Sequence, residues 1–329
     1  MQTANVIGVL RGSRAEWAGQ TALVTAHYDH LGRGWPDARA GDAGTLHPGA
    51  DDNASGVAVL LELARVVAGG ERPPRSIVFV AFSGEETGVA GATHYATHPV
   101  GPLDKVIGVI NLDTVGRLGS GKVAVLGTGT ATEWPHIFRG ASFVTGVESS
   151  SIAGSYEASD QRVFIERGVP AVQVFTGPHA DYHRPTDTAD KVDIAGLVKV
   201  ATLAREAVVY LGERADPLTA TIAGASTAKV PAPAGGPPAS QARRVTFGAV
   251  PDFAFEGTGV RLSGLTAGSP AERAGMKEGD VITRVGDRPV ANLREFSDVL
   301  RTLTAGQSVT VVYVREGQEQ SASVTVVER

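Results

Sequence analysis

Short apolar runs alternate with amphipathic stretches along the N-terminal part of the chain. The apolar runs have the length of β-strands, and the amphipathic stretches carry apolar residues at helical spacing. This alternation predicts an α/β fold with a mostly parallel, mixed sheet flanked by helices. The predicted strands are residues 5–10, 21–26, 77–82, 106–112, 123–126 and 169–175, and the predicted helices are 57–67, 91–98 and 194–211.

The pattern stops beyond the last of these helices. Residues 219–242 are rich in Ala, Pro, Ser, Thr and Gly and have no apolar period, which is typical of a semi-extended linker. Strand and helix patterns return from residue 245. We therefore predict a first domain over residues 1–213, a linker over 214–242 and a small α+β domain over 243–329.

Composition narrows the possible functions. The 329 residues are 42% hydrophobic and 20% charged, with a net charge of -5, and no cluster of Lys and Arg suggests a nucleic-acid or membrane surface as partner. The absence of cysteine excludes disulfides, thiolate metal ligands and a cysteine nucleophile. Met1–Arg11 lacks a signal-peptide pattern, and no apolar run is long enough to span a membrane. We expect a soluble chain.

Candidate chemistry gathers where the predicted strands end. In an open α/β sheet, ligands bind outside the carboxyl ends of the strands. Imidazole nitrogen and carboxylate oxygen are zinc ligands, and two metals about 3.5–4 Å apart can clamp the intermediate of a hydrolysis. The pattern therefore predicts a two-metal hydrolytic site. Its candidate residues are His27, Asp51, Glu85, Glu86, Asp113 and His183.

Each residue also has an ordinary interpretation. A single strand-end His is more often a surface or core residue, Glu85-Glu86 could begin a helix, and Asp51-Asp52-Asn53 could cap one. Several carboxylates converging on one edge of a sheet would, however, repel one another unless cations neutralise them. The combination therefore favours a metal site.

Five segments of the first domain resemble the signature blocks of the co-catalytic di-zinc aminopeptidase family, which includes glutamate carboxypeptidase II, the transferrin receptor and the glutaminyl cyclases. The resemblance covers roughly residues 4–213. The segments are His27-Tyr28-Asp29-His30-Leu31-Gly32, Gly49-Ala50-Asp51-Asp52-Asn53-Ala54-Ser55-Gly56, Phe82-Ser83-Gly84-Glu85-Glu86, Asn111-Leu112-Asp113 and Tyr182-His183-Arg184-Pro185-Thr186-Asp187-Thr188.

The resemblance implies two Zn²⁺ ions and a role for each candidate. Asp51 would bridge the metals, His27 and Asp113 would hold one zinc, and Glu86 and His183 would hold the other. Glu85 would take a proton from the water between the metals and pass it to the leaving amine. A cis peptide bond is expected at Asp51-Asp52.

The same resemblance implies supporting residues. The Asp29 carboxylate would orient the His27 imidazole, Tyr182 would either bind the oxyanion or pack at the rim of the site, and Asp160 would be a structural or supporting carboxylate. The remaining histidines match no ligand position and are predicted to be ordinary loop or surface residues. They are His30, His47, His94, His98, His136 and His179.

The C-terminal domain resembles PDZ domains of the bacterial protease-associated type. The resemblance rests on Gly268-Ser269-Pro270-Ala271-Glu272-Arg273-Ala274-Gly275-Met276 and Gly279-Asp280-Val281-Ile282. Such domains add an extended peptide to a sheet edge and capture its terminal carboxylate. The candidate carboxylate loop is Phe247-Gly248-Ala249-Val250, facing a helix over 293–303. Alternatively, the domain only packs on or occludes the first one.

Together these patterns predict a zinc aminopeptidase that acts on peptides with a free amino terminus, secreted or periplasmic in its full-length form. The PDZ domain would recruit C-terminal peptides. Three alternatives remain open on the same scaffold: a glutaminyl-cyclase-like transferase, a carboxypeptidase or dipeptidase, and a binding protein without activity.

Overall fold

The computed structural model describes residues 3–36, 41–154, 159–222, 245–252, 255, 257–266 and 268–328. The chain divides into two compact units. The first comprises the described residues within Met1–Gly32, His47–Gly177 and Pro185–Lys229. The second comprises those within Arg33–Leu46, Pro178–Arg184 and Val230–Arg329.

The described part of the first unit is built on a seven-stranded mixed sheet with the order β1-β3-β2-β4-β7-β5-β6. Strands β3, β2, β4 and β7 are parallel, whereas β1 is antiparallel to β3 and β5 is antiparallel to β7. The predicted mostly parallel, mixed sheet is confirmed. Its strands are β1 (Val6–Leu10), β2 (Thr21–His27), β3 (Ser76–Phe82), β4 (Val106–Leu112), β5 (Val123–Leu126), β6 (Ser149–Ile152) and β7 (Ala171–Phe175).

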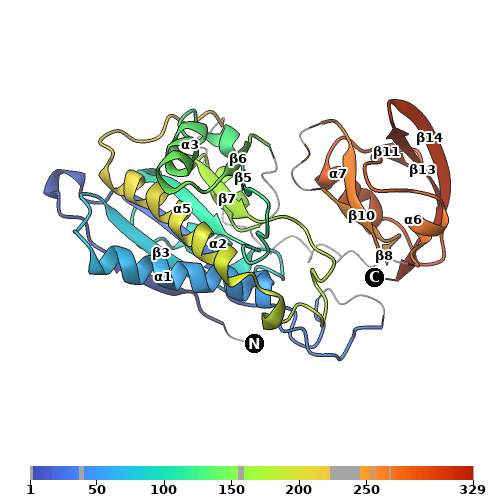
Figure 1. Cartoon of the computed structure of the whole chain (residues 1–329), viewed down its shortest axis with the longest axis horizontal. Coiled ribbons are helices and arrows are strands. Elements are labelled where there is room, and N and C mark those ends of the chain that lie inside the picture. The colour runs from blue at the N-terminus through green and yellow to red at the C-terminus, as the bar shows by residue number, and fades with distance from the viewer. Residues whose placement is uncertain are drawn as a thin grey trace. The chain divides into compact units, whose positions relative to one another are not determined.

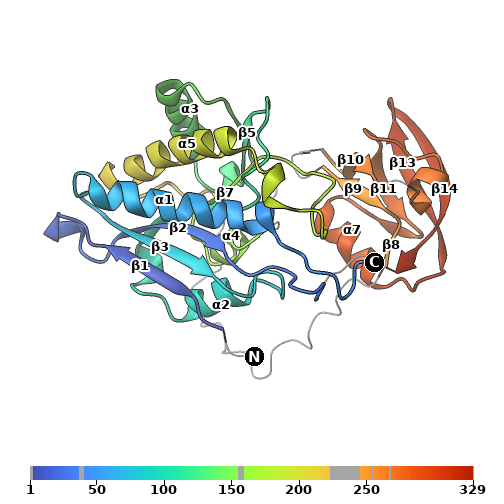
Figure 2. The same ribbon diagram turned by 60° about the horizontal axis from the view of Figure 1, so that its bottom comes forward.

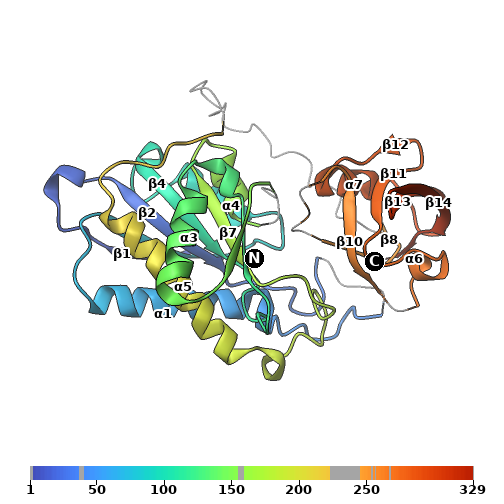
Figure 3. The same ribbon diagram turned by 45° about the horizontal axis from the view of Figure 1, so that its top comes forward.

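Helices cover both faces of this sheet (Figure 1). One face packs against α1 (Gly56–Gly69), α3 (Trp134–Thr145) and α5 (Ile194–Glu213), and α5 lies beside both other helices (Figure 3). The opposite face packs against α2 (Ala90–Thr97) and α4 (Gln161–Ile165). Figure 2 shows β1, β3 and β2 as neighbouring strands, with α1 along them.

Strand β3 shows why both faces need covering. Ile77 and Phe79 enter the core beneath α1 and α5, while Val78 and Val80 enter the core beneath α2 and α4. Complete burial of such side chains contributes about 1.5–3 kcal/mol each. Continuous apolar runs of this kind are typical of a sheet buried on both sides. The order of these buried strands in the sheet decides which strand ends lie side by side at one edge.

Several elements were not predicted from the sequence. Strand β6 reads Ser149-Ser150-Ser151-Ile152 and lacks an apolar run, although it pairs in register with β5. Helix α3 begins with Trp134 and Pro135, and α4 has only five residues. Among the described helices, none has the length and hydropathy that a membrane crossing requires.

The packed part of the first unit continues beyond residue 213, where the linker was predicted to start. Leu218 is buried in the core beneath α3 and α5, and the backbone amide of Thr219 donates to Glu133. The first domain therefore extends further than predicted. Residues 223–242, the rest of the predicted linker, lie outside the described residues.

The second unit contains a small, mainly antiparallel sheet with the order β14-β13-β11-β10-β9 and two helices. Its core includes Phe247, Phe296 and Val311. The elements are β8 (Val245–Thr246), β9 (Ala249–Pro251), β10 (Val260–Leu265), α6 (Pro270–Arg273), β11 (Val281–Val285), β12 (Arg288–Pro289), α7 (Leu293–Arg301), β13 (Ser308–Arg315), β14 (Gln318–Thr325) and β15 (Val327–Glu328).

Candidate metal centre

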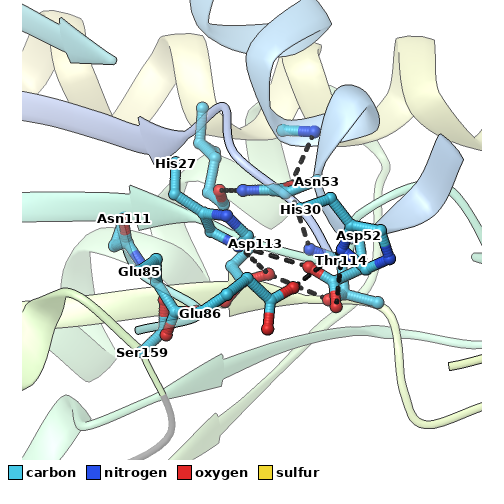
Figure 4. A network of polar contacts seen from close by, with 12 residues as sticks. His27, His30, Asp52, Asn53, Glu85, Glu86, Asn111, Asp113, Thr114 and Ser159 are labelled. Carbon is cyan, nitrogen blue, oxygen red and sulfur yellow. Dashed lines mark hydrogen bonds and ion pairs between the residues drawn. The ribbon is translucent and has the colours of Figure 1, made fainter. Parts of the chain in front are cut away.

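The carboxyl ends of three adjacent parallel strands deliver the predicted residues to one edge of the sheet. His27 ends β2, Asp113 follows β4, and Glu85 and Glu86 follow β3. These strands are neighbours in the sheet, so their ends meet. Figure 4 shows the side chains of these residues gathered together with those of His30 and Asp52.

The first group of possible ligands consists of His27, Asp52 and Asp113, all buried. The Nε2 atom of His27 lies 3.2 Å from Asp52 Oδ1 and 3.5 Å from Asp113 Oδ1. Two ligands of a tetrahedral zinc with bonds of about 2.0–2.1 Å lie about 3.3 Å apart. The donor types and their spacing therefore fit a zinc ion.

The charge of this group also fits a cation. Burial alone would lower the pKa of His27, but the neighbouring Asp113 and Asp52 carboxylates raise it well above its ordinary value. The pocket thus attracts positive charge, either as a proton on the imidazole or as a metal ion. Because a metal must displace that proton, binding there depends on pH.

The second group consists of His30, Asp52 and Glu86. The Nδ1 atom of His30 lies 2.7 Å from Glu86 Oε1 and 3.9 Å from Asp52 Oδ2. The two oxygens of the Asp52 carboxylate therefore face two different groups, Oδ1 toward His27 and Oδ2 toward His30. A carboxylate in this position can bridge two cations.

The carboxylate that faces both groups belongs to Asp52, whereas the sequence predicted this position for Asp51. The Oδ1 atom of Asp51 accepts from the Gly116 amide at 2.5 Å and from the Ser55 hydroxyl at 2.9 Å. Asp51 therefore braces the turn, and it belongs to neither group of possible ligands. The cis peptide bond also lies one residue later than predicted, at Asp52-Asn53.

Asp52 is held by hydrogen bonds from distant parts of the chain. Oδ2 of Asp187 accepts from the backbone amides of Asp51 and Asp52 at 2.9 and 3.1 Å. The side chain of Asn53 donates to the Leu112 carbonyl at 2.9 Å, next to Asp113. These contacts tie the turn that carries Asp52 to the end of β4.

Asp29 acts differently from the prediction. Its carboxylate lies 3.9 Å from His27 Nδ1, too far for a hydrogen bond. The backbone carbonyl of Asp29 lies 3.0 Å from that nitrogen instead. The carboxylate accepts from the amides of Glu85 and Glu86 at 3.1 and 3.4 Å. It therefore positions the loop that carries both glutamates.

Glu85 has the environment that a general base needs. Burial raises the pKa of its carboxyl group well above the ordinary range, with His27 opposing the shift and Glu86 and Asp160 adding to it. A raised pKa brings a carboxylate closer to the value at which it exchanges protons near neutral pH. The role of Glu85 as general base stays a prediction.

Two predicted residues fall in the segment Pro178–Arg184, which groups with the second unit. Within that segment the ring of Tyr182 stacks on that of His183, with centroids 4.0 Å apart. The prediction that His183 binds metal and that Tyr182 contacts the substrate stays a prediction.

The sequence interpretation missed two residues at the site, His30 and Asp187. His30 was predicted to be an ordinary loop or surface residue, but its side chain is only 9% exposed and belongs to the second group. His47 lies in a loop, as predicted, and is buried there. Asp187 lies in the last of the five family-like segments, but the resemblance gave it no role. The spacing of His30, three residues after His27, was the one available signal.

Asp160 is a buried carboxylate beside the site. Both of its oxygens are buried and lack a hydrogen bond within the described residues. Flanking residues fix its position, because Asn111 Nδ2 donates to Ser159 Oγ at 3.0 Å and to Gln161 Oε1 at 3.1 Å. Burial raises the pKa of Asp160 to about 7; His27 opposes this and Asp113 and Asp29 add to it.

This raised pKa predicts a pH-dependent stability of the zinc-free protein. Between about pH 4 and pH 7 the folded state keeps the Asp160 proton whereas the unfolded chain releases it, so stability falls as pH rises through that window. The loss is at most roughly 4–5 kcal/mol. We expect Asp160→Asn to flatten this part of the pH dependence.

Urea unfolding of chelator-treated protein between pH 4.5 and 7.5 tests the prediction. Tryptophan fluorescence follows the first unit through Trp17 and Trp134, and replacing Trp35, which groups with the second unit, by Phe removes the remaining signal. Parallel pH profiles for the wild type and Asp160→Asn would contradict the assignment.

The predicted peptide-binding loop of the second unit is partly built into its core. The Phe247 side chain is buried edge-on against Phe296, with ring centroids 5.6 Å apart, so it cannot line a ligand groove. Gly248 has a φ of 82°, and a Cβ atom added to it would lie 2.1 Å from the Cβ atom of Ser269. A larger residue would therefore clash at this position. Strand β9, with Ala249 and Val250, forms an edge of the sheet. Its role in peptide binding stays a prediction.

Comparisons with known proteins identify both parts of the chain. Residues 5–208 match the model of Peptidase family M28, and residues 248–326 match that of the PDZ domain. Both predicted resemblances are thereby confirmed. Aminopeptidase YwaD of Bacillus subtilis is 29% identical over 215 residues, which are 62% of this chain and 44% of that protein.

Two further similarities agree with this result. A probable zinc metalloprotease of Pyrenophora teres f. teres is 43% identical over 112 residues, which are 34% of this chain and 22% of that protein. The solved structure of BSAP, a zinc aminopeptidase from Bacillus subtilis, has a TM-score of 0.55 and 27% identity, covering 67% of this chain and 53% of that chain. This chain thus spans less than half the length of these curated relatives.

Proposed function

Because the chain belongs to peptidase family M28, we propose that it is a zinc-dependent exopeptidase that removes N-terminal residues from peptides. The observation that carries the proposal is the Asp52 carboxylate, whose two oxygens face two separate groups of possible metal ligands. The names of YwaD and BSAP, both aminopeptidases, support the choice of reaction.

In this proposal two zinc ions share Asp52. His27 and Asp113 complete the first position, and Glu86 contributes to the second together with His183, as predicted from the sequence. When bound, zinc polarises the scissile carbonyl and lowers the pKa of water. Asp187 and Asn53 keep Asp52 in place through their hydrogen bonds to the backbone of the turn and of β4.

Glu85 moves the protons. Its carboxylate takes a proton from the attacking water and returns it to the nitrogen of the leaving amine, so that one group serves as base and then as acid. The carboxylate of Asp29 holds the backbone amide of Glu85 at 3.1 Å, which fixes the base against the edge of the sheet. The raised pKa of Glu85 suits both steps.

Hydrolysis of a free peptide compared with its N-acetylated twin tests the proposal. We expect zinc-loaded protein to release the first residue only from the free peptide, and a chelator to abolish the release. Cleavage of both peptides would indicate carboxypeptidase or endopeptidase action. If neither is cleaved while zinc is bound, the exopeptidase proposal fails and the glutaminyl-cyclase-like or binding alternatives remain.

For the second unit we propose recruitment of proteins or peptides through their C-termini, by addition of a strand to the edge at β9. Its match to the PDZ domain model supports this. Location outside the cytoplasm is a further hypothesis from the family resemblance, and fractionation of cells that make the full-length protein would test it.

A further inference from the structure

The loop over residues 83–89 connects β3 to α2 and carries both glutamates of the candidate metal centre. Its two ends are bonded to one side chain, that of Asn5. The Ser83 amide, directly after β3, donates to Asn5 Oδ1 at 3.2 Å. At the other end, Asn5 Nδ2 donates to the Gly91 carbonyl, in the first turn of α2, at 2.9 Å. One side-chain amide therefore closes the base of the loop.

An asparagine suits this position because its side chain offers both a donor and an acceptor. The oxygen of Asn5 faces an N–H group and its nitrogen faces a C=O group, as a peptide unit of a neighbouring strand would. Ser83 and Gly91 are both buried. Buried backbone groups need hydrogen-bond partners, and Asn5 supplies one at each end of the loop.

The contact between Asn5 and the loop is also close. A Cβ atom added to Gly91 would lie 2.5 Å from Asn5 Oδ1 and 2.8 Å from the Ser83 nitrogen. The junction therefore has no room for a side chain on Gly91. Because this residue is glycine, the Asn5 amide lies directly against both ends of the loop.

Asn5 is itself held in place on both sides along the chain. The next residue, Val6, pairs with Ala81 where β1 lies beside β3 (Figure 2). The carbonyl of the preceding residue, Ala4, accepts from the Tyr28 hydroxyl at 2.7 Å. The Asn5 side chain thus projects from a fixed stretch of backbone, and a group held in this way positions its partners precisely.

A second attachment lies in the middle of the same loop. The Asp29 carboxylate accepts from the amides of Glu85 and Glu86 at 3.1 and 3.4 Å. Asp29 therefore holds the middle of the loop and Asn5 holds its base. With one attachment the loop would pivot about it, whereas two attachments fix both its place and its direction.

We propose that Asn5 is a positioning residue for the loop that carries Glu85 and Glu86. By holding the two ends of the loop, Asn5 fixes the place from which Glu85 moves protons and Glu86 reaches the second metal position. The inference rests on the proposed function, because that function gives the two glutamates their roles. A displacement of about 1 Å can lower a catalytic rate about 100-fold.

Two variants and a matched control test this role in the full chain. Asn5→Ala removes both hydrogen bonds to the loop. Asn5→Asp keeps an oxygen for the Ser83 amide but replaces the donor that faces the Gly91 carbonyl. Ser13→Ala is the control, because Ser13 Oγ donates to the Pro73 carbonyl at 3.3 Å, a bond of the same kind beyond the opposite end of β1.

Hydrogen exchange measured by mass spectrometry reports on the loop without zinc or substrate. In chelator-treated protein, we expect Asn5→Ala to speed exchange of the amides in residues 83–91 about tenfold, because the loop opens more often when its base is not held. Asn5→Asp should speed this exchange less, since one of the two bonds remains. Ser13→Ala should match the wild type in this segment.

Steady-state kinetics at saturating zinc supply the second measurement. We expect Asn5→Ala to lower kcat roughly 10–100-fold with a smaller change in KM, because the loop positions the base rather than the substrate. Ser13→Ala should keep the wild-type kcat. Circular dichroism establishes that each variant is folded, and Asn5→Asp carries the test if Asn5→Ala does not fold.

Two results would overturn the proposal. The first is wild-type exchange in residues 83–91 together with wild-type kcat in Asn5→Ala. The second is an equal loss of kcat in Ser13→Ala, because a general loss of stability would then explain the effect. A wild type that cleaves no peptide, with faster loop exchange in Asn5→Ala, would refute the proposed function and leave the positioning of the loop by Asn5 standing.

Discussion

Replacement of Glu85 by Gln should leave two zinc ions bound and lower kcat by about 10²–10⁴-fold. Gln has nearly the same shape as Glu but cannot accept a proton from the attacking water. The hydrogen bond from the Glu85 backbone amide to Asp29 does not depend on the side chain, so the loop should keep its position. The metal content should remain unchanged, because Glu85 belongs to neither group of possible ligands.

Steady-state kinetics together with zinc analysis of the same preparation provide the measurement. Glu166→Gln is a suitable control, since Glu166 is an exposed glutamate just after α4. It should retain full activity. Near-wild-type turnover in Glu85→Gln would show that another group takes the proton and would refute the role of Glu85.

Substitution of the adjacent residues Asp51 and Asp52 should have different effects on zinc binding and on stability. Asp52→Ala removes the carboxylate whose oxygens face both groups, so zinc should bind at least roughly 100-fold more weakly at both positions, beyond the usual cost of losing a supporting partner. The zinc-free variant should be folded, because the substitution also relieves repulsion between Asp52 and neighbouring carboxylates.

Asp51→Ala should lower the stability of the protein but leave its zinc affinity unchanged. It removes the acceptor of the buried Gly116 amide, whereas the Ser55 hydroxyl keeps its bond to the Asp51 carbonyl. An unpaired buried donor costs about 1–3 kcal/mol, so the free energy of unfolding should fall while zinc binding persists in the folded fraction. Calorimetric zinc titration and urea unfolding of both variants measure the two effects separately. If Asp51→Ala lost zinc and Asp52→Ala kept it, the original assignment to Asp51 would be right.

Much of the fold and of the site could be predicted because the signals for them lie in short segments of the sequence. Apolar runs of strand length identified six of the seven strands in the described sheet, and parallel neighbours bring their carboxyl ends to one edge. The side chains of His27, Glu86 and Asp113 accordingly lie together at that edge, and their role as metal ligands stays a prediction. The missed strand β6 lacks an apolar run, so its register comes from pairing with β5.

The choice between Asp51 and Asp52 could not be made locally. The two residues carry the same side chain in one turn, and the direction in which each points depends on backbone angles within that turn. Those angles are held by Asp187 and Gly116, which are far away in the sequence. The sequence displayed two equivalent carboxylates, and long-range hydrogen bonds decided which one faces the imidazoles.

The sequence by itself determined the family, the α/β architecture and the kind of chemistry, because strand periodicity, loop spacing and ligand type are properties of short segments. Only the tertiary structure decided that Asp52 spans the two groups, that the Asp29 carboxylate holds the glutamate loop, and that His30 contacts Glu86. Each of these depends on side chains from separate segments meeting within about 3–4 Å, a distance at which hydrogen bonds and ion pairs act. The path of the folded backbone sets such distances.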